Sequence, residues 1–136
     1  MPLPLDQSSS RHGPAATAPA DSRFPHERLD CYRLSHEVVA FLAAHRDRLR
    51  GLPGEAGPQL ERAAVRTLLN IAEAAGRQAP RDRARVFAIA RGEACEAAAA
   101  LEVATLYGAL TAAQATWARS RLVRVGQMLS RLSRLP

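Results

Sequence analysis

Four stretches in which apolar residues recur every three or four positions, separated by breaks that contain glycine and proline, fill most of this chain of 136 residues. The spacing matches the turn of an α-helix, so each stretch has one apolar face that must be buried. None of them shows the two-residue alternation of a β-strand. The predicted helices begin near Asp30, Gln59, Pro80 and Thr111.

The connections between the predicted helices are short. Residues 51–58 concentrate glycine and proline, and Gly76 and Gly108 are natural ends for the second and third helices. Short connections place consecutive helices side by side in opposite directions. We therefore expect an all-α fold, an antiparallel up-down-up-down four-helix bundle formed by residues 24–136 as one domain.

The composition also favours helices, except at the N-terminus. Alanine, leucine and arginine dominate and are strong helix formers, whereas only 4% of the residues are aromatic. Residues 1–23 are instead rich in proline, serine, alanine and glycine and have no apolar period. Such a segment cannot bury enough surface to offset its chain entropy, so we expect a disordered N-terminal tail.

The two cysteines, Cys31 and Cys95, form neither a CxxC pair nor a disulfide framework. This pattern fits a reducing compartment. The sequence has no run of about 18 apolar residues that could span a membrane. Its first residues also lack the charged start and apolar core of a signal peptide. We expect a soluble, cytoplasmic protein that does not bind membranes.

Candidate catalytic and metal-binding groups are few. The four histidines form no pair at metal-binding spacing on one helix face, so no metal site is expected; they are His12, His26, His36 and His45. Glu73 and Glu96 could form an acid pair, but no nucleophile, phosphate-binding glycine loop or Ser-His-Asp order accompanies them. We expect no enzymatic activity and no cofactor.

Five polar residues of the second predicted helix form a row beside its apolar face. They follow one another at steps of four, four, three and four: Arg62, Arg66, Asn70, Glu73 and Arg77. One interpretation is a subunit or partner interface, in which the arginines are held by Glu73 of the same helix and by Glu96 of the third helix. The other is a structural network at the edge of the core, where arginines need partners. We favour a structural or oligomer-forming role.

Positive charge gathers towards the C-terminus. The formal net charge is +6, and residues 103–136 contain no acid but five arginines: Arg119, Arg121, Arg124, Arg131 and Arg134. This surface could bind nucleic-acid phosphates with little sequence preference, and Arg81, Arg83 and Arg85 could extend it. The alternative is a solvated helix face that only keeps the protein soluble.

Two motifs resemble a known family. The first is Leu52-Pro-Gly-Glu55, followed by Gln59-Leu60, Arg62-Ala63-Ala64 and Asn70-Ile-Ala-Glu-Ala-Ala-Gly-Arg77. The second is Ala90-Arg-Gly92 with Glu96 and Leu101. Over about residues 24–132 the chain resembles the 23S rRNA intervening sequence protein family of four-helix bundles. Ala74 stands where that family usually has glycine, and Glu93 stands where it usually has serine.

The resemblance implies a bundle that assembles into a ring-like homopentamer. A related group, the accessory proteins of diversity-generating retroelements, is similar in fold and binds nucleic acid together with a reverse transcriptase. We therefore expect a non-enzymatic, homo-oligomeric scaffold or adaptor whose basic surface contacts RNA or DNA, with a reverse-transcriptase-like or other protein as a further partner. The alternative is a purely structural protein–protein interaction module that binds no nucleic acid.

Overall fold

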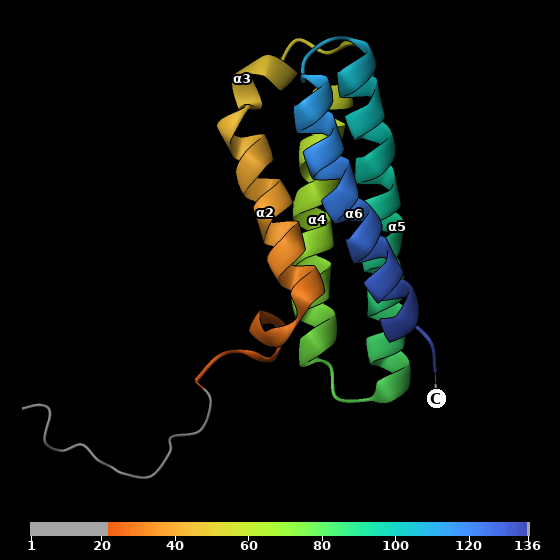
Figure 1. Ribbon diagram of the computed structural model, residues 1–136. Coiled ribbons are helices and arrows are strands. Elements are labelled where there is room, and N and C mark those ends of the chain that lie inside the picture. The colour runs from red at the N-terminus through yellow and green to blue at the C-terminus, as the bar shows by residue number, and fades with distance from the viewer. Residues whose placement is uncertain (1–21, 136) are drawn as a thin grey trace, which may run out of the picture.

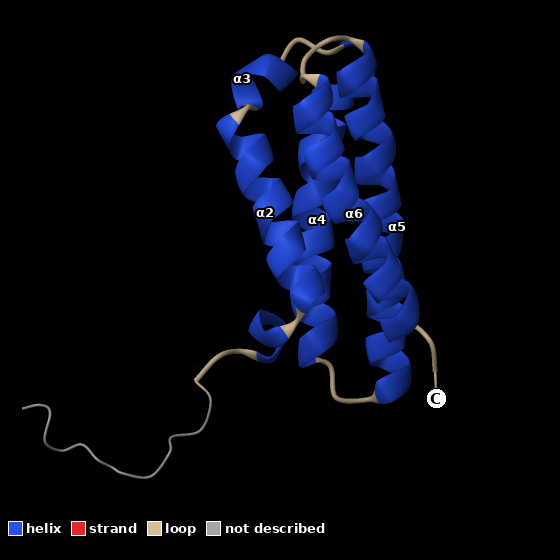
Figure 2. Ribbon diagram, viewed as in Figure 1, coloured by secondary structure: helices blue, strands red, loops and turns tan. Residues whose placement is uncertain are grey.

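The computed structural model describes residues 22–135, and all regular structure in this range is helical (Figure 2). The elements are η1 (Pro25–Arg28), α2 (Asp30–Ala44), α3 (Arg46–Leu49), η2 (Pro53–Glu55), α4 (Ala56–Gly76), α5 (Pro80–Leu106) and α6 (Ala112–Leu132). The prediction of an all-α fold is confirmed for this range. The predicted disordered tail, residues 1–23, lies outside it except for its last two residues.

The four long helices lie side by side (Figure 1). α4 packs against α5, α5 packs against α6, and α2 packs against both α6 and α4. The short α3 continues from α2 after a bend at His45, whose backbone leaves the helical region. No helix within the described residues is both long and apolar enough to cross a membrane.

The core consists of the apolar faces predicted from the sequence. Four positions of α6 that follow the expected spacing are buried: Ala118, Leu122, Val125 and Leu129. α5 contributes mainly alanines, which allow its neighbours to approach closely, and the buried ones are Ala84, Ala90, Ala94, Ala97, Ala100 and Ala104. Ile89, although apolar and within the predicted third helix, is 44% exposed and lies outside this core.

The ends of the helices follow local chemistry. Thr111 caps α6, because its hydroxyl accepts from the backbone of Gln114 while the Gln114 side chain accepts from the Thr111 backbone. Pro80 opens α5. Asp30 is the first residue of α2, as expected, but the second long helix begins at Ala56 rather than near Gln59, which corrects that expectation.

Candidate functional site

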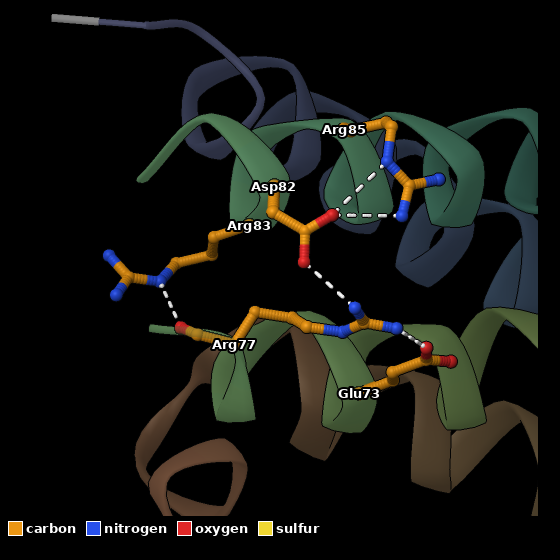
Figure 3. A network of polar contacts seen from close by, with 5 residues as sticks. All are labelled: Glu73, Arg77, Asp82, Arg83 and Arg85. Atoms are coloured by element: carbon orange, nitrogen blue, oxygen red, sulfur yellow. Dashed lines mark hydrogen bonds and ion pairs between the residues drawn. The ribbon is translucent and has the colours of Figure 1, made fainter. Parts of the chain in front are cut away.

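The end of α4 and the start of α5 are joined by a network of ion pairs (Figure 3). Arg77 contacts Glu73 one turn earlier on α4, and its Nη1 donates to Asp82 Oδ2 at 2.8 Å. Asp82 Oδ1 also accepts from Arg85 Nη2 at 2.9 Å. Hydrogen bonds from Arg85 and then Arg77 lower the pKa of the Asp82 carboxyl. Asp82 therefore stays ionised and bridges the two helices.

Arg83 adds to this network by donating hydrogen bonds to backbone carbonyl oxygens. Its Nε donates to the carbonyl oxygen of Arg77 at 3.0 Å (Figure 3). Its Nη2 donates to the carbonyl oxygen of Gln78 at 3.0 Å. These carbonyls follow the end of α4, where helix geometry no longer supplies donors. Of the three arginines expected to extend a basic patch, Arg83 and Arg85 are thus engaged within the chain. Arg81 is exposed and has no ion pair among the described residues.

A second contact joins α2 to α6. Arg121 Nε donates to Glu37 Oε1 at 2.8 Å, and the Arg121 guanidinium carbon lies 3.8 Å from the centre of the Trp117 ring. The hydrogen bond from Arg121 is the largest of the effects that lower the pKa of the Glu37 carboxyl. Trp117 in turn packs against Phe41, with ring centres 5.3 Å apart. Arg121 is therefore a helix–helix contact as well as a surface cation.

The other four C-terminal arginines differ from Arg121. Arg119, Arg124, Arg131 and Arg134 are exposed, and within residues 22–135 their guanidinium groups have no ion pair or hydrogen bond. The acids nearest in sequence, Glu93, Glu96 and Glu102, all belong to α5. These four arginines, like Arg81, are exposed cations without an ion pair among the described residues.

The row of polar residues on α4 divides into two parts. Glu73 and Arg77 belong to the network of ion pairs that joins α4 to α5 (Figure 3). Arg62 and Arg66 are exposed, and Asn70 is half-buried, and none of the three has a side-chain partner within the described range. Glu96, expected to hold these arginines, is exposed and likewise makes no ion pair with a described residue.

Sequence reasoning missed the acids that organise both contacts. Asp82 holds two arginines and Glu37 holds Arg121, yet neither was singled out. Asp82 could have been found, since it lies five residues after Arg77 across a short connection. Glu37 gave no local signal, because 84 positions separate it from Arg121.

The histidines and cysteines of the described residues lie outside both of these contacts. No group of three or more histidine, cysteine or acidic side chains suited to a metal ion occurs within the described residues. His45 contacts the Phe41 carbonyl oxygen at 2.8 Å and Gln114 Nε2 at 3.2 Å. Cys31 is buried, which raises the pKa of its thiol to about 11, whereas Cys95 is exposed. His12 lies outside the described range.

Long amphipathic helices with arginine-rich outer surfaces place this chain in the class of small all-α proteins. The model of the 23S rRNA-intervening sequence protein family matches residues 27–131. Because this match covers most of the chain, the protein belongs to that family. No curated protein matches the sequence.

Proposed function

We propose that this protein is a non-enzymatic, cytoplasmic scaffold or adaptor that acts as a homo-oligomer. The observation that carries the proposal is the outer surface of α4 and α5, where Leu69 is 60% exposed and Ile89 is 44% exposed. Exposed apolar side chains on neighbouring helices mark a protein-binding surface where they form one contiguous patch. The cytoplasmic location rests on the two separate cysteines.

Within this proposal the four long helices form an antiparallel up-down-up-down bundle. Only residues 77–79 connect α4 to α5, and residues 107–111 connect α5 to α6. Helices that are packed together and joined by so few residues must reverse direction. The contact of α2 with α6 then closes the bundle.

Because α4 and α5 run in opposite directions in this arrangement, their exposed apolar residues lie at about the same height along the bundle. Leu69 and Ile89 lie about equally far from the connection between α4 and α5. Around them, α4 presents the unpaired cations Arg62 and Arg66, and α5 presents the unpaired anion Glu96. Among these unpaired groups the sign of the charge differs between the two halves of this surface, which we call the α4–α5 face.

This charge pattern supports a particular kind of assembly. The α4 half of one copy complements the α5 half of another, and the contact is proposed to be head-to-tail because the family resemblance implies a ring. Head-to-tail contacts produce a ring when the rotation between copies closes. The homopentamer expected from the family resemblance is such a ring.

A second role, binding of RNA or DNA, is favoured by the exposed arginines of α6. Arg119, Arg124, Arg131 and Arg134 lie on one helix without acidic partners, and several copies in one assembly would multiply their effect. A reverse-transcriptase-like protein or another protein would then be a further partner. If nucleic acid does not bind, the assembly is a purely structural interaction module.

The oligomer is tested by the mass in solution of Leu69→Glu, measured by light scattering. Leu69→Glu places a charge in the centre of the α4–α5 face, so we expect it to dissociate the assembly; Arg62→Ala should weaken it. Val123→Glu is the matched control, because Val123 is a 39% exposed apolar residue on α6. Equal masses for wild type and Leu69→Glu would exclude this face as the interface.

A further inference from the structure

An open hollow lies between the start of α5 and the end of α6, which meet at the same end of the molecule (Figure 1). Its volume is about 600 Å³. Its apolar lining consists of Ala79, Ala84, Ala88 and Leu135, and its polar lining of Arg81, Asp82, Arg85 and Ser133. No other part of the proposed function uses it.

The rim of the hollow is positively charged. Asp82 is its one acid, and this carboxylate is already bound by Arg77 and Arg85. Arg81 remains exposed without an ion pair in the described range, and Arg134 lies between the lining residues Ser133 and Leu135. The hollow therefore offers an aliphatic floor beside cations that have no internal partner.

We propose that this hollow holds one unpaired nucleotide of a single-stranded nucleic acid. Its volume is in the range of small-ligand sites. The phosphate is placed at Arg81, and the sugar or base rests on Ala88 and Leu135. A duplex keeps its bases stacked inside, so only a single strand presents a base to such a hollow.

Two free arginines of α6 lie outside the hollow, on the side of α6 that faces α2, where Arg131 lines a separate hollow with Leu29 and Asp30. Arg124 and Arg131 are seven residues apart, which gives a rise of about 10.5 Å along the helix and places both on one side of it. Such a row follows a phosphate backbone rather than a compact anion. The inference rests on the nucleic-acid role proposed above, and it adds the kind of strand and the point of base contact.

The test measures fluorescence anisotropy of a labelled single-stranded oligouridine and of an RNA duplex of the same length with the full-length protein. The key variant is Ala88→Leu, which fills the hollow without changing charge. Ala88 is exposed on a helix and leucine is a strong helix former, so the fold is preserved. Ala99→Leu is the matched control, because Ala99 is also exposed on α5 but does not line the hollow.

We expect Ala88→Leu to weaken single-strand binding about tenfold, with duplex binding and the Ala99→Leu control unchanged. Arg81→Gln should weaken single-strand binding similarly and reduce its dependence on salt. If Ala88→Leu binds the single strand like wild type while Arg124→Ala/Arg131→Ala does not, the hollow is not the site, although the nucleic-acid role stands. If wild type binds neither RNA at low salt, both proposals fail; binding of an acidic peptide in place of RNA would also overturn this inference.

Discussion

At Gly57 the backbone of α4 passes directly against Leu49 at the end of α3. A Cβ added at this position would lie 2.1 Å from the Leu49 carbonyl oxygen, and neither backbone can move aside cheaply. Gly57→Ala should therefore lower the free energy of unfolding by about 1–3 kcal/mol in urea denaturation. Gly92→Ala is the control: nothing lies within 4 Å of its added Cβ, and alanine should stabilise α5 by about 0.5–1 kcal/mol. Equal destabilisation by both would contradict this account.

Ser35 is a buried polar residue whose hydroxyl forms no hydrogen bond in the described part of the core. Its hydroxyl is buried and has no hydrogen-bond partner, whereas the buried Thr67 hydroxyl donates to the Ala63 carbonyl oxygen at 2.8 Å. Ser35→Ala removes an unsatisfied group and should raise the free energy of unfolding by about 1 kcal/mol, and Thr67→Val should lower it. Thermal melts check both; a destabilised Ser35→Ala would mean that its hydroxyl has a partner in solution.

Among the elements, α2 and α6 are joined by the Glu37–Arg121 ion pair. Because this contact lowers the pKa of Glu37 in the folded state, its stabilisation is complete above the unfolded pKa and is lost as the pH falls through the folded value. The melting temperatures of wild type and Glu37→Gln should therefore differ at neutral pH and converge in acid. Glu102→Gln, which removes an exposed carboxylate without an ion pair in the described range, is the control. A difference that persists unchanged in acid would show that this ion pair is not its source.

The elements themselves were largely predictable, because the apolar spacing of each helix is a local property. The buried positions of α6 from Ala118 to Leu129 follow it directly. Contacts between elements were not predictable in the same way. Arg121 appeared as one of five equivalent C-terminal arginines, and only the packing of α2 against α6 assigns it to Glu37. The hollow at the end of α5 likewise depends on how far α6 extends beside it.

At the scale of the whole molecule, the regular spacing of apolar residues predicts which side chains each helix buries against the rest of its own chain. It does not predict which exposed side chains are covered by another molecule. Leu69 and Ile89 show this limit: both are apolar and helical, yet the chain leaves them exposed. Their neighbours Arg62, Arg66 and Glu96 lack ion pairs among the described residues. The proposed assembly supplies partners for all of these groups from a second copy, which no analysis of a single helix can provide.

The measurement that tests this account most directly is the mass of the wild-type protein in solution across a wide concentration range. We expect a homopentamer that persists on dilution and weakens in high salt, because oppositely charged groups contribute to the α4–α5 face. A monomeric mass at every concentration would contradict the account.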